Sequence, residues 1–215
     1  MKMALLIVLL LGSNPSLWAQ LTHEQFQTLI KKVRWLEKYD IRYRESVRLP
    51  GEAQPWVMDC SNTVRYLAKE SFGLNLPRVA SGQYWELEKA GKVFKAPVLP
   101  DGRVDDQRLI ESLASGDLLF WEWTYDIKRS PPITHVMIYL GRDAKGIPKM
   151  AGSSSSRSGG VGTYTFNPNA PMGGVRSASG GYKKVARFVG HGRLFEMTDH
   201  GRNVVTLPHF LLRAN

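Results

Sequence analysis

The sequence predicts an α+β domain, with helices concentrated in its first half and strands in its second half. Apolar residues recur at helical spacing between Leu21 and Tyr39 and again after Asp59. The stretch "THVMIYL" at 134–140 places alternate residues on two faces, which is typical of a strand. The chain has 215 residues, 43% hydrophobic and 22% charged, which suits one globular domain with a core.

Residues 1–19 have the pattern of a secretory signal peptide. A short basic start precedes the apolar run 4–11, which is too short to span a bilayer, and residues 12–15 break that run before Ala19. We expect cleavage after Ala19 and an exported protein in the periplasm or outside the cell. Since no later stretch is long and apolar enough for a membrane helix, we expect no stable membrane anchor.

The first predicted helix spans 21–39, and we expect the segment 20–40 to pack on the main domain. Thr22 and Gln25 have the spacing of a capping box, in which each side chain bonds the other residue's backbone N–H. Apolar residues three or four apart form one face of this helix: Phe26, Leu29, Ile30, Val33, Leu36 and Tyr39.

A second predicted helix begins near Asp59, after a Pro- and Gly-containing loop at 43–58. Asp is a good N-cap because its carboxylate accepts hydrogen bonds from the free N–H groups of the first turn. Gly73 and Pro77 end the helix. Cys60, the only cysteine of the chain, directly follows the predicted N-cap.

The remaining elements are shorter. We expect a short helix and a second structured segment before the strands, at 83–90 and 104–114. Strands are predicted at 118–123, 134–140, 161–166 and 184–189. The Ser- and Gly-rich segment 152–181 has little apolar surface to bury, which predicts long mobile loops. The tail, 193–215, is less patterned and is assigned as a C-terminal extension.

The formal net charge is +10, and the Lys and Arg residues are scattered along the chain. This charge suits a polyanionic setting, and the export signal favours the cell envelope, although a basic surface also simply confers solubility. No closely spaced His, Cys, Asp and Glu residues suggest a metal site, and no phosphate-binding loop occurs. We therefore expect no metal, no cofactor, no nucleic-acid partner and a monomer.

A lone cysteine in an exported chain implies intermolecular pairing, a buried bystander or a reactive thiol. A helix start lowers the pKa of a cysteine below its ordinary value of about 8.5, while the adjacent Asp59 opposes this effect. First-turn N–H groups also stabilise an oxyanion. A strand histidine is more often a packed core residue, yet paired with Cys60 it makes His135, beside Met137 and Tyr139 on one strand face, a candidate general base.

Five segments, in order, resemble the NlpC/P60 family of cysteine peptidases. The match covers roughly 41–189, most of the mature chain. The segments are "RYRES" at 42–46, "DCSNTVRYLAKESFGLNLPR" at 59–78, Gln83 with Gly91, "SGDLLFW" at 115–121 and "ITHVMIYLG" at 133–141.

The resemblance implies a papain-like fold over 41–192, with helices packed on an antiparallel sheet. It implies Cys60 as the nucleophile and His135 as the general base. It also implies Tyr43 as a tyrosine near the thiol and Asp59 as a contact for the free amine of the substrate. The implied reaction is hydrolysis of peptide bonds in peptidoglycan stems, with peptidoglycan as the partner.

The sequence departs from the family at the third catalytic position. A His, Asn or Gln on the next strand usually orients the base, whereas in "PKMAGSSSS" Ala151 or Gly152 falls at this place. We assign the orienting role to Ser153. A neighbouring serine, His191, a backbone carbonyl or water are alternatives.

The leading interpretation is therefore an exported cysteine endopeptidase or amidase acting on peptidoglycan stem peptides. An alternative is a catalytically weak or inactive cell-wall-binding module with the same fold, which the missing third residue favours. A further alternative is another acyl-transfer reaction, on a lipid or a small amide. The presence of both Cys60 and His135 favours an enzyme, because a binding module needs neither.

Overall fold

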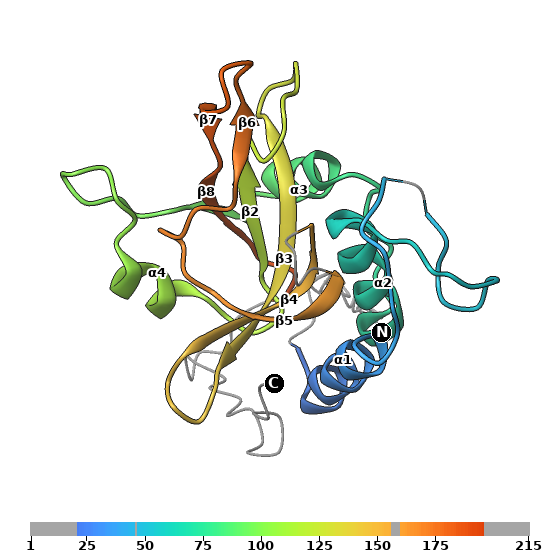
Figure 1. Cartoon of the computed structure of the whole chain (residues 1–215). Coiled ribbons are helices and arrows are strands. Elements are labelled where there is room, and N and C mark those ends of the chain that lie inside the picture. Colours follow the sequence, from blue (N-terminus) through green and yellow to red (C-terminus); the bar gives the residue numbers. More distant parts are fainter. Residues whose placement is uncertain (1–20, 46, 156–159, 196–215) are drawn as a thin grey trace, which may run out of the picture.

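A six-stranded antiparallel sheet forms the centre of the fold (Figure 1). The structure is a computed structural model that describes residues 21–45, 47–155 and 160–195. Strand order in the sheet is β1-β8-β2-β3-β4-β5, and β6 and β7 form a separate hairpin. The strands are β1 (Val93–Lys95), β2 (Leu118–Glu122), β3 (Ile133–Arg142), β4 (Pro148–Ser154), β5 (Gly160–Thr165), β6 (Gly174–Arg176), β7 (Tyr182–Val185) and β8 (Arg187–Gly192). The helices are α1 (His23–Leu36), α2 (Cys60–Phe72), α3 (Ala80–Lys89) and α4 (Asp106–Ser112).

Each face of the sheet carries its own hydrophobic core, which confirms the predicted α+β class. Side chains of α1, α2 and α3 pack with Val136 and Ile138 of β3 in the larger core. Met137 and Tyr139, the alternate residues of β3, face the smaller core together with Leu109 of α4. Figure 1 accordingly shows α1 and α2 on one side of the sheet and α4 on the other.

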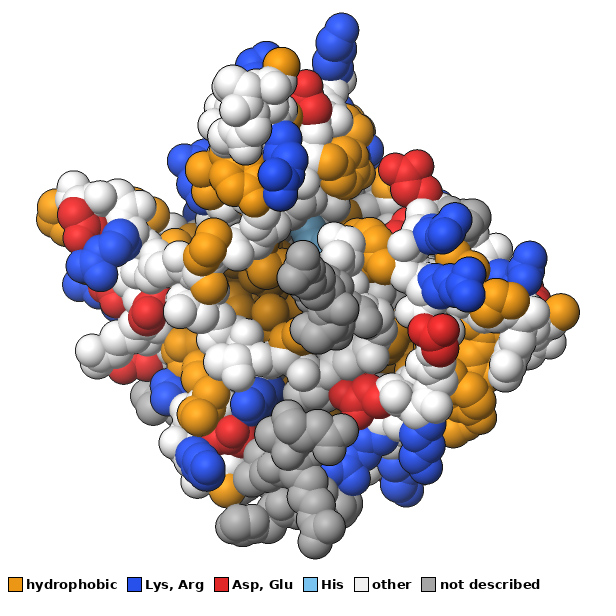
Figure 2. Space-filling model, viewed as in Figure 1, with side chains coloured by type: hydrophobic (Ala, Val, Ile, Leu, Met, Phe, Trp, Pro, Cys, Tyr) orange, Lys and Arg blue, Asp and Glu red, His pale blue; other side chains and the backbone are white. Residues whose placement is uncertain are grey.

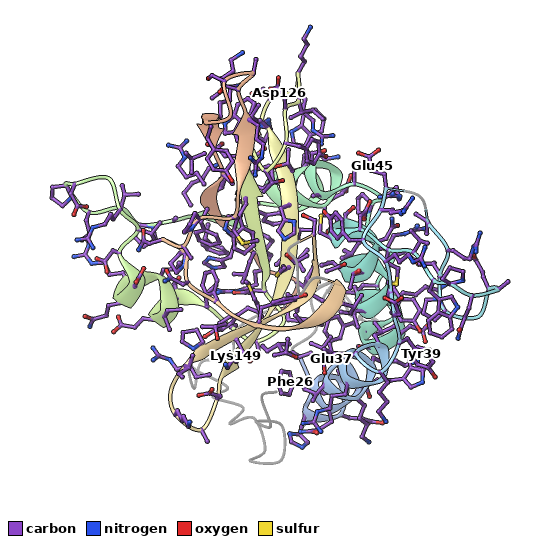
Figure 3. The ribbon with its side chains drawn as sticks, viewed as in Figure 1. Phe26, Glu37, Tyr39, Glu45, Asp126 and Lys149 are labelled. Atoms are coloured by element: carbon purple, nitrogen blue, oxygen red, sulfur yellow. The ribbon has the colours of Figure 1, made fainter. Side chains whose placement is uncertain are left out.

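The two N-terminal helices begin at the predicted caps, and α2 ends as predicted, whereas α1 ends at Leu36, before the predicted end at 39. Thr22 and Gln25 form the expected capping box of α1. At the far end of this helix, the carboxylate of Glu37 accepts a 2.7 Å hydrogen bond from the backbone N–H of Thr163, which ties α1 to β5 (Figure 3). Helix α2 has Asp59 as its N-cap and ends at Gly73, whose φ of 71° is left-handed and therefore favours glycine.

The segment 152–181 contains the predicted strand at 161–166, observed as β5, but less of it is loop than predicted. It contains the end of β4 and the strands β5 and β6. Glycine and serine form paired strands here as readily as larger residues do, because only backbone groups form the hydrogen bonds of a β-ladder. Gly152, for example, lies opposite Gly162. Phe166, directly after β5, anchors the segment in the smaller core.

The region beyond 183 also differs from the predicted single strand. Two strands, β7 and β8, flank Ala186, whose backbone N–H donates to the carbonyl of Gly173. The described part of the predicted C-terminal extension packs on the domain, since Leu194 and Phe195 belong to the larger core. The predicted signal peptide and residues 196–215 lie outside the described residues.

The surface carries its charge as the sequence indicates. Lys and Arg side chains are dispersed over the visible face among acidic and neutral ones, without a single basic patch (Figure 2). Across the described ranges, no helix has both the length and the apolar character needed to cross a bilayer.

Candidate active site

The candidate site is a gap between β3 and β4 into which the first turn of α2 inserts. The two strands pair only from Ile138, opposite Ala151, toward the hairpin end. The backbone of β3 before Ile138 is therefore open on this side. Cys60 Sγ lies 3.8 Å from the carbonyl oxygen of Thr134, and the N–H of Val136 also bonds the sulfur. The thiol thus contacts the two residues that flank His135.

The Cys60 thiol is nearly enclosed, with 4% of the residue exposed. Burial raises its pKa, because a thiolate loses hydration in a low-dielectric site. A hydrogen bond with Tyr43 lowers the pKa, the charge of Asp59 raises it, and the N–H groups of Val136 and Ser61 lower it, with burial the largest of these effects. In the free protein, burial thus acts on the pKa of Cys60 against the lowering that we expect from the helix start.

His135 faces the smaller core from β3. Its ring packs edge-to-face against Trp121 of β2, with ring centroids 5.7 Å apart. Burial lowers the pKa of His135 to about 4, and the charge of Asp59 acts in the opposite direction. Its Nε2 atom is buried and has no hydrogen-bond partner, and within the described residues none of its bonds reaches the Cys60 thiol. In the free protein, the pKa shifts of both groups favour their uncharged forms, a thiol and a neutral imidazole.

The carboxylate of Asp59 is already fully engaged. One oxygen accepts hydrogen bonds from the backbone N–H and side-chain amide of Asn62 and from the Ser61 hydroxyl, at 2.8 to 3.1 Å. The other oxygen lies 2.9 Å from Nη2 of Arg78, whose Nη1 donates to Ser61. Asp59 thus caps α2 and anchors Arg78. Its assigned contact with a substrate amine stays a prediction.

Ser153 does not face the imidazole. Its hydroxyl donates to the carbonyl of Met58 at 3.3 Å, and the side chain is fully buried on the face of the sheet that the helices cover. His135 lies on the opposite face, because alternate residues of β3 point to opposite sides. The assignment of Ser153 as the orienting residue is therefore corrected.

The place of the missing third residue is filled by a neighbouring side chain. A Cβ atom on Gly152 would lie 2.9 Å from Cγ of Met137, so Met137 covers the face of β4 on which an orienting residue is expected. Ala151 points the other way, into the larger core. Neither position presents a polar group to His135.

Sequence reasoning missed two residues near the thiol. Arg78 ends the motif at 59–78, where the sequence gives it no role, and the structure pairs it with Asp59. Tyr125, in the loop between β2 and β3, lies close enough for a negative charge on Cys60 to raise its pKa, although burial is the larger effect. An arginine four residues further on, Arg129, donates to the Tyr125 hydroxyl at 3.2 Å. Neither the Arg78–Asp59 pair nor the proximity of Tyr125 to Cys60 has a sequence signal, since only the fold brings these residues together.

The described residues hold no group of three or more His, Cys, Asp and Glu side chains suited to a metal ion. The chemistry that this arrangement offers is that of a cysteine and a histidine. A cysteine at a helix start next to a strand that carries a histidine is the arrangement that cysteine hydrolases use.

The comparison with protein families agrees with this class. The model of the NlpC/P60 family matches residues 49–160, just over half of the chain, and this range includes both Cys60 and His135. The chain therefore belongs to the NlpC/P60 family. Members of this family are generally cysteine peptidases and amidases that act on peptidoglycan. The comparison with curated proteins found no match.

Proposed function

We propose that the protein is an exported cysteine endopeptidase or amidase that hydrolyses peptide bonds in peptidoglycan stem peptides. Cys60 is the nucleophile and His135 is the general base. The observation that carries this proposal is the position of the Cys60 thiol in the gap beside β3, bonded to the backbone on both sides of His135. Family membership supplies the substrate class.

In the proposed reaction, His135 takes the thiol proton as the Cys60 sulfur attacks the amide carbon. First-turn N–H groups of α2 that do not donate to Asp59 stabilise the oxyanion. The imidazolium then gives its proton to the leaving amine, which yields a thioester. Water, activated by the neutral imidazole, hydrolyses the thioester and frees the thiol.

The shifted pKa values predict modest turnover. Burial raises the pKa of Cys60 and lowers that of His135, so transfer of a proton from one to the other is uphill in the free protein. Substrate groups that bind in the site must stabilise the charged pair. Tyr43 assists, since its hydrogen bond favours the thiolate.

A wall-binding module without efficient catalysis is the second candidate. One specific observation favours it. Met137 covers Gly152 at the third position, and Nε2 of His135 is left without a partner. An orienting residue holds the imidazole in the correct tautomer, so its loss weakens a hydrolase.

Digestion of purified peptidoglycan separates the two candidates. Wild type, Cys60→Ala and His135→Ala are incubated with the polymer, and released fragments are identified by mass spectrometry. Stem-peptide cleavage by wild type alone supports the hydrolase. If all three proteins pellet with the polymer and none releases fragments, the binding module replaces it.

A salt series tests the role of the basic surface. Exposed charges are screened within about 10 Å at 0.1 M salt. Pelleting with cell walls should weaken as salt rises, while cleavage of a small soluble stem peptide should change little. Equal loss of both would contradict a role of the +10 charge in wall association alone.

A further inference from the structure

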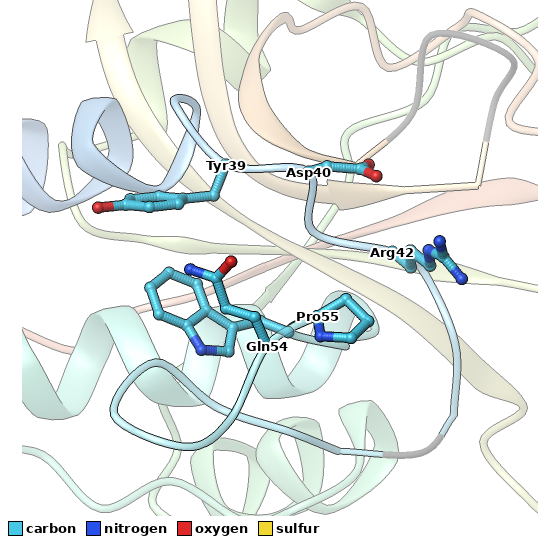
Figure 4. Close-up of a pocket in the computed structure, with 6 residues that line it drawn as sticks. Tyr39, Asp40, Arg42, Gln54 and Pro55 are labelled. Atoms are coloured by element: carbon cyan, nitrogen blue, oxygen red, sulfur yellow. The ribbon is translucent and has the colours of Figure 1, made fainter.

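A second concave site lies outside the gap that holds Cys60. It is a pocket of about 420 Å³ between the segments 39–42 and 54–56. Figure 4 shows these two segments facing one another across it, with Tyr39 on one side and Gln54 on the other. Its volume falls within the range of about 300–1,000 Å³ typical of small-molecule sites. Its lining is formed by Tyr39, Asp40, Arg42, Gln54, Pro55 and Trp56.

Aromatic rings form one wall of this pocket. The rings of Tyr39 and Trp56 lie 4.7 Å apart at an angle of 53°, and Trp35 packs against both. The indole N–H of Trp56 donates to the carbonyl of Glu52 at 3.0 Å, which fixes the ring. Tyr39 is 38% exposed whereas Trp56 is buried, so Tyr39 is the part of this aromatic wall that a ligand can reach, with Trp56 packed against it.

The polar lining is unengaged by the protein. Among the described residues, the side chains of Asp40, Arg42 and Gln54 form no hydrogen bond or ion pair with the rest of the chain. Together they offer an acceptor, a planar donor and an amide that does both. One negative and one positive charge balance, so the lining fits a neutral ligand with many hydroxyl and amide groups better than it fits a polyanion.

The pocket and the thiol lie at successive residues of one segment. The backbone N–H of Arg42 donates to the carbonyl of Trp56, and its carbonyl accepts from the N–H of Met58. The next residue, Tyr43, bonds the Cys60 thiol. The pocket therefore adjoins the backbone segment that contacts the thiol.

We propose that this pocket is a sugar subsite that binds an N-acetylated hexosamine of the glycan strand carrying the stem peptide. A pyranose ring presents C–H groups to an aromatic face and hydroxyl and amide groups at its rim, which matches the wall and the lining. The identity of the glycan rests on the proposed function. Binding of a sugar as such does not.

The direct test uses the Cys60→Ala protein, which cannot turn over substrate, and a β-1,4-linked tetramer of N-acetylglucosamine. Binding is measured by isothermal titration calorimetry. Gln54→Ala and Tyr39→Ala should each weaken binding at least ten-fold. Tyr182→Ala, which removes a 51% exposed tyrosine of β7, is the matched control and should change binding less than two-fold.

Two results would overturn the subsite: no binding of the tetramer, or binding that Gln54→Ala and Tyr39→Ala leave unchanged. Circular dichroism of Tyr39→Ala checks that the aromatic cluster still folds. Gln54→Ala carries the test if it does not, since Gln54 makes no contact that the fold needs.

A kinetic arm distinguishes failure of the subsite from failure of the proposed function. The active protein is given the same stem peptide either free or attached to its disaccharide. A lower KM for the attached form, abolished by Gln54→Ala, supports the subsite. Equal cleavage of both forms contradicts the subsite and leaves the hydrolase intact. Sugar binding without cleavage of either form contradicts the hydrolase and leaves the subsite intact.

Discussion

Met137 and Gly152 occupy the place where the family pattern expects a hydrogen-bond partner for the His135 ring. The family pattern expects a polar side chain on β4, facing the histidine side of the sheet. In this chain the position on β4 is a glycine, and the side chain of Met137 from β3 covers it. The apolar methionine fills the space but cannot accept a hydrogen bond from an imidazolium, and Nε2 of His135 has no partner among the described residues.

A histidine introduced at Gly152 should therefore orient the His135 ring only if the Met137 side chain is shortened. Gly152→His alone should destabilise the protein by about 1–3 kcal/mol through overpacking, without gain in activity. The double variant Met137→Ala/Gly152→His should recover stability and exceed wild type in stem-peptide kcat/KM by about ten-fold. Met137→Ala alone is the control. A single Gly152→His variant as active as the double one would show that Met137 does not block the position.

Tyr43 acts on the thiol from the other side. Its hydrogen bond lowers the pKa of Cys60 against the larger effect of burial. Tyr43→Phe should raise the pH midpoint of iodoacetamide alkylation by about one unit, since a hydrogen bond to a charged group contributes about 1.5–3 kcal/mol. Tyr66→Phe, a tyrosine of α2 for which burial also raises the pKa, is the control. An unchanged alkylation midpoint in Tyr43→Phe would mean that Tyr43 does not influence the Cys60 thiol.

At the scale of elements, the start of α2 and the opening of the sheet depend on each other. The ladder between β3 and β4 stops at Ile138, which frees the β3 backbone that Cys60 contacts. Asp59 holds the first turn in this gap by accepting from the N–H of Asn62 and pairing with Arg78. The cap therefore positions the nucleophile as well as stabilising the helix.

Substitution of Asp59 separates its two roles. Asp59→Ala should lower the free energy of unfolding by about 2–3 kcal/mol, because the cap and the partner of Arg78 are both lost. Asp59→Asn keeps the capping oxygen and should lose about 1 kcal/mol. Urea unfolding measures both. Asp105→Ala, which removes the N-cap of α4, is the matched control at about 1 kcal/mol. Equal losses of unfolding free energy in Asp59→Ala and Asp105→Ala would mean that Asp59 contributes to stability only as an N-cap.

At the scale of the whole molecule, buried titratable groups tie stability to pH. Burial lowers the pKa of His135 to about 4 and that of His191 to about 3, so both are neutral in the fold at pH 7. Asp117 lies next to His191 and pairs with Arg193, yet burial raises its pKa to about 6. The two histidines and the aspartate have opposite effects on the pH dependence.

Stability should fall as the pH is lowered from 7 to 5. Below about 6.5 the unfolded chain binds protons at both histidines while the folded protein does not, which favours unfolding. Protonation of Asp117 in the folded state below pH 6 offsets part of this effect. The net loss should be about 2 kcal/mol by urea unfolding.

His135→Gln provides the check on this assignment. It removes one of the two buried imidazoles and should abolish most of the net loss between pH 7 and 5. Retention of the full loss in His135→Gln would mean that other groups set the pH dependence.

The sequence by itself determined helices α1 and α2, the strands β2, β3 and β5, and the family. Local signals sufficed for these: the capping box at Thr22, the N-cap at Asp59 and the alternation around His135 are properties of neighbouring residues. They also fixed Cys60 and His135 as the candidate pair. Such signals depend on residues a few positions apart, so they can be read from the sequence without knowledge of the fold.

Only the tertiary structure decided how the site is finished. It placed the Met137 side chain over Gly152, directed the Ser153 hydroxyl to the carbonyl of Met58 and raised the pKa of Cys60 by burial. Each of these outcomes depends on which face of a strand meets which segment far away in the chain. Strand alternation relates residues within one strand, whereas the partner across the gap and the depth of burial are set by packing of the whole domain.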